Sequence, residues 1–414
     1  MRVLLVGAGG VREHILVEQL ARSSEVSVLT PKRNPALIRL VPKSFICNVE
    51  NLEVIGSWAL QERIDLAVIT SEDALVAGLS DALEKIGIAV ASPSQLASAF
   101  AWDRAAAFRL MDKAGIAHPS FTLCQNPQAL SAAFKGGSRP FVVKPPFHAP
   151  FVETRAFAPA QKKAALQHGK KLLRKYKGVL IQSIVDGAPF VLHAFSDGRR
   201  LSIAPPVQAV PRLEPGKIYG GAWASYSTGR YLPFLTAADV EKSQATLQRC
   251  IDALRQQDRP FKGMLSAEFV YTKRGPILMN FSPVLGNPEA LNVFGLLHTE
   301  LAEILQSMVD GQLKPVSFQD TPTMAKYLVP EGYPEKPKKK KEIDLNERAV
   351  WDAGVKYYVE SLEEKNKKYF TTHERTIVLL AKGESLEEAE SRIETAASHF
   401  TGPLTHWTKK ITAP

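Results

Sequence analysis

The chain has 414 residues, of which 45% are hydrophobic and 23% are charged, and its formal net charge is +10 at pH 7. This length exceeds one ordinary hydrophobic core, so we expect two to four domains. The composition is typical of a soluble globular protein, and the absence of any run of roughly 18 to 20 apolar residues excludes a membrane-spanning one.

The cysteines and the first residues predict a cytoplasmic protein. Cys47, Cys124 and Cys250 are widely spaced and odd in number, which indicates a reducing compartment and no cysteine metal cluster. The start MRVLLVGAGG runs from an apolar strand into glycines. It lacks the charged, apolar and cleavage-site order of a signal peptide.

The positive charge favours anionic partners such as nucleotides and phosphate esters. It concentrates in residues 162–177 and 336–341. The first stretch is a helical pattern with leucines available for packing, so we interpret it as a solvated helix face. The second is a proline-containing loop without the interleaved aromatic residues on which bases stack. Nucleic acid is therefore not an expected partner.

Residues 1 to about 115 alternate short apolar runs with helical patterns, which predicts βαβ units and a parallel sheet. The predicted strands are Val3–Val6, Val26–Leu29, Leu66–Ile69 and Ala89–Ala91, and the predicted helices are Glu13–Arg22, Leu52–Glu62, Asp73–Ile86 and Leu96–Ala114.

A glycine-rich turn, Gly7-Ala8-Gly9-Gly10, follows the first strand and opens the first helix. The free amides and the dipole of a helix start suit an anion. The turn lacks the third glycine of a dinucleotide motif, and no acidic residue closes the second strand. A tight turn without a ligand is therefore an equally good interpretation.

The middle of the chain places Lys144 at the end of the predicted strand 139–144, before Pro145. A lysine there is costly unless its ammonium group reaches solvent or a phosphate. The loop that follows, PPFHAPF, has no glycine and three prolines, so it cannot wrap a phosphate with its amides. Further predicted elements are strands Val179–Ile184 and Pro189–Phe195, an irregular stretch Ile203–Tyr231, helices Thr236–Arg255 and Leu291–Val309, and a linker from Lys336 to about Leu345. Ala349 to Lys410 predicts a small α+β unit with strands Lys356–Glu360 and Arg375–Leu380 and a helix Leu386–Ser398.

Residues 262–289 predict a hairpin of strands Met264–Tyr271 and Pro276–Phe281. Glu268 interrupts the apolar pattern of the first strand. Such a carboxylate needs a partner, which is often a metal or a phosphate-bound cation. The alternative is an edge strand on which Glu268 faces water.

Several stretches, collinear over nearly the whole chain, resemble the phosphoribosylamine–glycine ligase family, also called glycinamide ribonucleotide synthetases. They are GAGGVREHIL, SEDALVAGLSDAL, YGGAWASYS, GPILMNFSPVLGNPEALNV, KYLVPEGYPEKP and RTIVLLAKGESLEEAESRI. The resemblance implies a multidomain α/β and α+β ATP-grasp enzyme: a Rossmann-like domain at 1–100, an ATP-grasp domain at 101–315 with an ATP-covering subdomain at about 118–190, and an α+β domain at 316–414. The implied reaction joins glycine to phosphoribosylamine in purine biosynthesis, with ATP forming an acyl phosphate and magnesium as cofactor.

The resemblance also assigns residues to the site. It implies nucleotide binding by Arg104, Lys144 and Gln182, substrate binding by Gly9, Gly10, Glu72, Gly220, Gly221, Asn287 and Glu289, and a metal site of Glu268, Asn280 and Ser282.

This chain departs from the family pattern at the nucleotide and metal positions. Arg104 replaces a lysine, the PPFHAPF loop replaces a glycine-rich loop, and Gln182-Ser183 replaces paired glutamates. The family's Glu-Phe-Asn is Asn280-Phe281-Ser282 here, and Val284 and Asn287 replace an arginine and an aspartate. Neutral oxygens attract a hard cation weakly, so Glu268 is the residue that restores one charged ligand.

Three hypotheses follow from these departures. The first is the family reaction with a rearranged metal site. The second is a catalytically impaired paralogue that binds a ligand or regulates an active ligase. The third is an ATP-grasp ligase with a different carboxylate or amine.

Overall fold

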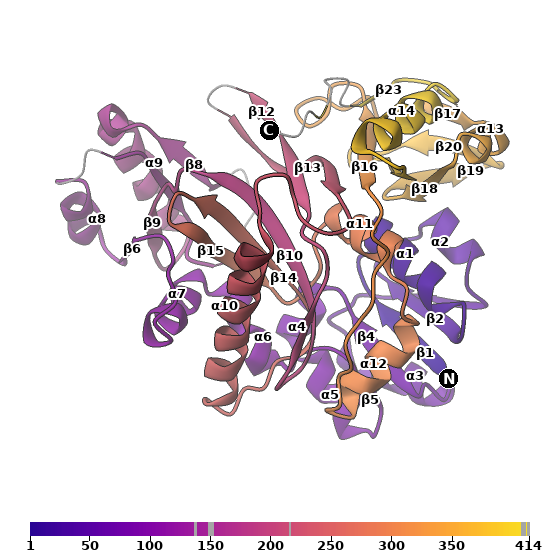
Figure 1. Ribbon diagram of the computed structural model, residues 1–414, viewed down its shortest axis with the longest axis horizontal. Coiled ribbons are helices and arrows are strands. Elements are labelled where there is room, and N and C mark those ends of the chain that lie inside the picture. The colour runs from indigo at the N-terminus through magenta and orange to yellow at the C-terminus, as the bar shows by residue number, and fades with distance from the viewer. Residues whose placement is uncertain (136–138, 148–152, 215–216, 407–410, 412–414) are drawn as a thin grey trace.

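The computed structural model describes the chain except residues 136–138, 148–152, 215–216, 407–410 and 412–414, and it gives only the backbone for 211–214 and 217–221. A parallel sheet at the N-terminus, a smaller lobe, a central antiparallel sheet and a C-terminal α+β part are arranged side by side (Figure 1). No helix among the described residues is long and apolar enough to cross a membrane.

The N-terminal part is a five-stranded parallel sheet in the order β3-β2-β1-β4-β5. Alternate residues of its central strand pack to opposite sides: Val3 and Leu5 in one hydrophobic cluster, Leu4 and Val6 in another. Helices therefore cover both faces, as parallel sheets require. The elements are β1 Arg2–Val6, α1 Val11–Leu20, β2 Glu25–Thr30, α2 Pro35–Arg39, β3 Lys43–Ile46, α3 Leu52–Gln61, β4 Leu66–Ile69, α4 Glu72–Ala77, α5 Leu79–Lys85 and β5 Ala89–Val90.

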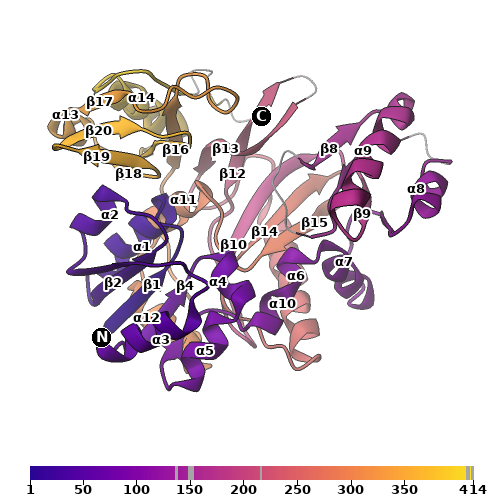
Figure 2. The ribbon, with the colours of Figure 1, turned by 180° about the vertical axis from the view of Figure 1, so that it is seen from behind.

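Two helices lead into a smaller lobe, which is an antiparallel sheet in the order β6-β9-β7-β8 covered by α8 and α9. Figure 2 shows this lobe at the far end of the molecule from the C-terminal part. The elements are α6 Gln95–Trp102, α7 Arg104–Lys113, β6 Phe121–Cys124, α8 Pro127–Ala133, β7 Phe141–Lys144, β8 Arg155–Phe157, the short 3-10 helix Pro159–Gln161, α9 Lys162–Lys175 and β9 Val179–Ser183.

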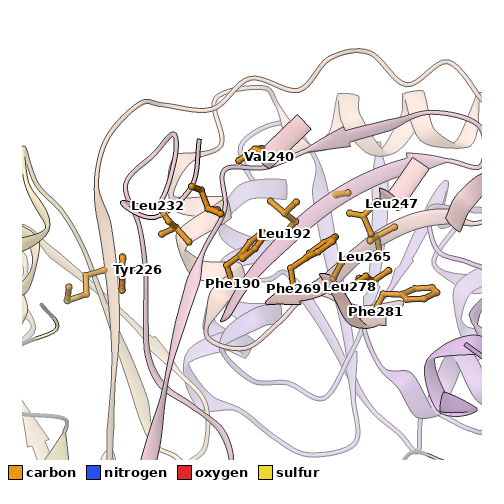
Figure 3. Packing of buried hydrophobic residues seen from close by; sticks show 14 of the residues in the cluster. Phe190, Leu192, Tyr226, Leu232, Val240, Leu247, Leu265, Phe269, Leu278 and Phe281 are labelled. Carbon is orange, nitrogen blue, oxygen red and sulfur yellow. The ribbon is translucent and has the colours of Figure 1, made fainter. Parts of the chain in front are cut away.

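The central sheet has the order β11-β10-β14-β15, and its apolar face forms the main core beside α10. Figure 3 shows Phe190 and Leu192 from β10 and Phe269 from β14 in this core, close to Val240 and Leu247 from α10. The elements are β10 Ala188–Asp197, β11 Leu201–Ile203, α10 Ala237–Arg255, β14 Lys262–Thr272, β15 Gly275–Ser282, α11 Glu289–Leu296 and α12 Leu301–Val309.

A sheet in the order β12-β13-β16-β21-β18 joins the centre of the chain to the C-terminal part, because β13 pairs with β16. A small second sheet, β19-β20-β17-β22, completes that part. The elements are β12 Gln208–Glu214, β13 Lys217–Ser227, β16 Thr323–Pro330, β17 Glu342–Leu345, α13 Glu347–Asp352, β18 Val355–Val359, β19 Leu362–Lys365, β20 Lys368–Thr371, β21 Ile377–Lys382, α14 Leu386–Ala397, β22 Phe400–Thr401 and β23 Leu404–His406.

The structure corrects several predicted elements. The helix predicted over Asp73–Ile86 breaks at Gly78, whose φ of +88° is the left-handed conformation that glycine adopts without strain. The helix predicted over Leu96–Ala114 breaks at Asp103, whose side chain caps α7 by accepting from the Ala106 amide at 2.8 Å. The helix predicted over Leu291–Val309 is likewise two, α11 and α12.

Three more expectations were wrong, because strand pairing is a tertiary property. The stretch Ile203–Tyr231 is largely β12 and β13, which pair with each other, and β13 also pairs with β16, about a hundred residues later. Glu268 is not on an edge strand, since β14 lies between β10 and β15. Part of the predicted linker is also the strand β17.

Candidate active site

The hairpin places Glu268 and Asn280 opposite each other on β14 and β15. Solvent reaches the Glu268 side chain, although the surrounding protein crowds it. That crowding raises the pKa of Glu268, and the positive charges of Lys144 and Arg104 act in the opposite direction. The carboxylate is therefore held in a site with two cations and is not an isolated surface charge.

Lys144 and Arg104 approach Glu268 from two other elements, the end of β7 and the start of α7. Burial and the neighbouring Arg104 lower the pKa of Lys144 to about 7, against the pull of Glu268. Burial also lowers the pKa of Arg104, which Glu268 and Glu72 oppose. We call Glu72, Arg104, Lys144 and Glu268 the charged cluster.

Arg104 also holds the loop that follows Lys144. Its backbone amide donates to the Pro146 carbonyl at 2.9 Å, and its guanidinium group lies 3.5 Å from the carbonyls of Pro145 and Phe147. The prediction for this loop continues over residues 148–151, which lie outside the described residues. The described part of the loop is held to α7 through its carbonyls, and Pro145 and Pro146 have no amide hydrogen to donate to a phosphate.

Ser282 is committed to a protein partner. Its hydroxyl donates to Glu72 Oε1 at 3.1 Å and accepts from the Val284 amide at 3.3 Å. Among the residues that the structure describes, no three acidic, histidine or cysteine side chains gather as a metal site would need. Glu268 and Asn280 remain as one carboxylate and one amide oxygen. They fit a magnesium ion whose other ligands are substrate phosphates and water, but not an ion held by protein alone.

Gln182 lies on β9 and is buried, and its Oε1 has no hydrogen-bond partner among the described residues. A buried acceptor without a partner costs about 1–3 kcal/mol. It therefore fits a ligand with an amino group to donate, such as adenine.

A second group of predicted residues meets where three parts of the chain join. The turn after β1 and the turn after β4 leave the same edge of the N-terminal sheet, at the point where the strand order reverses. Gly9 has φ of +81°, and its neighbour Gly10 precedes α1. A Cβ atom added to Gly10 would lie 2.5 Å from the Glu360 carboxylate. The turn therefore requires glycine, and Glu360 closes it.

Glu360 faces donors from the N-terminal part, from the turn before α11 and from the C-terminal part. The Val11 amide donates to its Oε2 at 2.9 Å, the Asn287 side-chain amide donates to its Oε1 at 3.1 Å, and Arg375 lies 3.8 Å away. The Tyr327 hydroxyl donates to the Asn287 side-chain oxygen at 2.5 Å. We call Val11, Asn287, Tyr327, Glu360 and Arg375 the three-way junction.

Gly220 and Gly221 lie in β13 immediately before Ala222, whose carbonyl accepts from Arg375 at 3.2 Å. The Arg375 guanidinium group also stacks over the Tyr327 ring, 4.2 Å from its centre. The structure therefore brings the two glycines of the sequence prediction to the margin of the three-way junction.

Glu289 connects the junction with the charged cluster. It is the first residue of α11 and is buried, and its Oε2 has no hydrogen-bond partner among the described residues. Burial raises the pKa of Glu289, Glu268 raises it further, and Arg375 lowers it. A buried carboxylate oxygen thus lies within electrostatic reach of both groups of residues.

Sequence reasoning missed Glu360, Arg375 and Tyr327. Glu360 and Arg375 lie at the ends of two predicted strands, 356–360 and 375–380, and this was the available signal. It was not enough, because only the pairing of Val359 with Ile377 shows that the two ends are neighbours. A cavity of about 500 Å³ between α1, α2 and β18 to β20 contains none of the predicted residues.

Comparisons with known proteins give the family. Residues 1–100 match the phosphoribosylglycinamide synthetase N domain, and residues 103–290 match the ATP-grasp (A) domain of the same family. A phosphoribosylamine–glycine ligase of Pyrococcus furiosus is 32% identical over 98% of this chain and 93% of its own length. The corresponding ligase of Methanothermobacter thermautotrophicus is also 32% identical, over 98% of this chain and 95% of its own length.

The fold agrees with these relatives. The crystal structure of a phosphoribosylamine–glycine ligase from Thermotoga maritima superimposes with a TM-score of 0.83 at 21% identity, over 98% of this chain and 99% of that one. An ADP complex of an N5-carboxyaminoimidazole ribonucleotide synthetase has a TM-score of 0.70 at 14% identity, over 96% of each chain. The chain belongs to the phosphoribosylamine–glycine ligase family of ATP-grasp enzymes.

Proposed function

We propose that the chain is an ATP-dependent ligase that joins the carboxylate of glycine to the amino group of phosphoribosylamine. The near full-length similarity to ligases of that name supports the reaction. The observation that carries the proposal in this structure is the charged cluster, in which Lys144 and Arg104 converge on Glu268 from separate elements.

The two cations suit the transfer of a phosphoryl group. Their positive charges would lie against the triphosphate, and Arg104 keeps its charge at every physiological pH. Lys144, with a pKa near 7 in the free protein, gains a proton as the anion arrives, because a negative neighbour favours the ammonium form. Gln182 would accept from the adenine amino group, which satisfies its buried oxygen.

Glu268 and Asn280 would hold the magnesium ion that accompanies ATP, and that ion would neutralise charge on the transferred phosphate. The charge supplied by the protein itself comes from Arg104 and Lys144.

The three-way junction would bind the amine substrate, and Glu289 beside it would activate the amine. First, a carboxylate oxygen of glycine would attack the γ-phosphorus of ATP, the bond from that phosphorus to the bridging oxygen breaks, and ADP leaves with the electron pair. The amine then attacks the carbonyl carbon of the acyl phosphate. A carbon–nitrogen bond forms, the carbon–oxygen bond to phosphate breaks, and inorganic phosphate leaves with the electron pair. Glu289 would take the proton that the attacking amine loses, because its buried Oε2 has no hydrogen-bond partner among the described residues and burial raises its pKa.

A second candidate is a binding or regulatory relative that no longer turns over substrate. Two contacts favour it, because in each a protein group takes the hydrogen bond of a residue predicted to bind a ligand. Ser282 donates to Glu72, and Glu360 accepts from the amide that follows Gly10.

Calorimetry with ATP and magnesium, followed by phosphate release on adding glycine and phosphoribosylamine, separates the two candidates. We expect ATP to bind and phosphate to appear only when both other substrates are present. ATP binding without phosphate release would favour the regulatory candidate. A folded sample that binds no ATP at millimolar concentration would exclude the ligase.

A further inference from the structure

Glu360 places a carboxylate at the start of α1, where an external anion would otherwise bind. Its Oε2 accepts the Val11 amide at 2.9 Å and would lie 2.5 Å from a Cβ atom on Gly10. The amides at the start of a helix attract negative charge. In this chain Glu13 accepts the Gly10 amide, and Glu360, 349 positions after Val11, accepts the Val11 amide.

The other groups facing this carboxylate are also donors. The Asn287 amide is 3.1 Å from Oε1, and the Arg375 guanidinium group is 3.8 Å away. Arg375 and Glu360 keep only 16% and 17% of their side-chain surface exposed. A partly buried backbone amide, side-chain amide and guanidinium group suit phosphate oxygens as well as they suit a carboxylate.

Glu289 supplies an independent sign that a ligand belongs here. Its buried Oε2 has no hydrogen-bond partner among the described residues, and it lies within the field of Arg375. The site thus offers donors around Glu360 and one unsatisfied acceptor nearby. That combination fits a molecule with an anionic group at one end and an amine at the other.

We propose that Glu360 occupies the subsite for the phosphate group of the amine substrate and competes with that phosphate. Only the identity of the substrate rests on the function proposed above. Two negative groups cannot share one set of donors, because juxtaposed like charges repel each other strongly. Glu360 therefore sets how tightly the chain binds a phosphorylated amine, and it must move aside before such a substrate binds.

Calorimetry with ribose 5-phosphate tests this proposal without ATP or turnover. The Glu360→Ala variant empties the subsite, and we expect it to bind ribose 5-phosphate at least about tenfold more tightly than the unmodified chain. Glu360→Gln removes the charge but keeps the volume, so its gain is smaller. Unphosphorylated ribose gains nothing in either variant. Glu364→Ala is the matched control, since it removes a carboxylate of the same part of the chain whose partner is the exposed Arg39.

The proposal is overturned if Glu360→Ala binds ribose 5-phosphate no more tightly than the unmodified chain, or if ribose or the Glu364→Ala control shows the same gain. Should Glu360→Ala fail to fold, Glu360→Gln decides by the same criterion. If Glu360→Ala does not bind ribose 5-phosphate more tightly, the proposed ligase reaction is unaffected. If Glu360→Ala does bind it more tightly but the chain shows no turnover, only the proposed reaction is contradicted. In an active enzyme, the same variants should lower KM for phosphoribosylamine more than they change kcat.

Discussion

The charged cluster changes the pKa of Lys144. A lysine that is exposed to water titrates near 10.4, but burial and Arg104 bring the pKa of Lys144 to about 7. Below that value the side chain is an ammonium group that attracts phosphate. Above it, the free protein must first take up a proton before it can use Lys144 to bind an anion.

ATP affinity should therefore weaken as the pH rises from 7 to 9, by up to about tenfold per pH unit. The Lys144→Arg variant stays charged across this range and should give a flatter profile. Calorimetry at several pH values measures both. Equal slopes for the two proteins would show that Lys144 does not contact the phosphates.

Among the elements, α1 depends on a buried carboxylate at its first turn. Glu13 is 1% exposed, accepts from the Gly10 amide at 2.8 Å and accepts from the Thr70 hydroxyl at 2.6 Å. It thus satisfies an amide of the glycine turn and ties the turn after β1 to the turn after β4. The geometry of the predicted anion site at Gly9 and Gly10 rests on this side chain.

Glu13→Gln should lower the free energy of unfolding by about 1–3 kcal/mol. The glutamine amide nitrogen is itself a donor, and it would face one of the donors from which the Glu13 carboxylate accepts a hydrogen bond. Urea unfolding followed by circular dichroism measures the change. Glu53→Gln is the control: it alters an acidic residue in the first turn of α3, but an exposed one, and should cost less than about 0.5 kcal/mol. Equal losses in both variants would argue against a special role for Glu13.

At the scale of the whole molecule, the sheet β12-β13-β16-β21-β18 fastens the C-terminal part to the centre of the chain. Lys326 lies on β16 with only 1% of its side chain exposed, and it donates at 2.6 Å to both Glu390 and Glu394 of α14. These pairs anchor α14 on the shared sheet. The same strand carries Tyr327 into the three-way junction, so the packing of the C-terminal part positions the site.

Replacing Lys326 by methionine should destabilise the protein by about 3–5 kcal/mol, since two carboxylates would lose their buried cation. Thermal and urea unfolding measure the loss. Lys314→Met, at an exposed position, serves as the matched control. A loss below about 1 kcal/mol would mean that solvent replaces the cation and that the pairs do not anchor α14.

The family, the alternation of strands and helices in the N-terminal part and the hairpin around Glu268 could be predicted from the amino-acid sequence alone, since they depend on local periodicity and on motifs in one order along the chain. It also predicted that Lys144 ends a strand, as β7 shows. The predicted domain limits and the roles of the site residues stay predictions.

The surroundings of those residues depend on how the chain folds and could not be predicted from the sequence. Glu360, Arg375 and the Gly10 turn are hundreds of residues apart in the sequence or lie on strands whose pairing no local pattern encodes. Likewise, the partner of Ser282 is Glu72, 210 positions away. The pKa and the binding role of a charged side chain depend on the donors and charges that lie beside it in the folded protein. In this protein, folding brings those neighbours together from three parts of the chain.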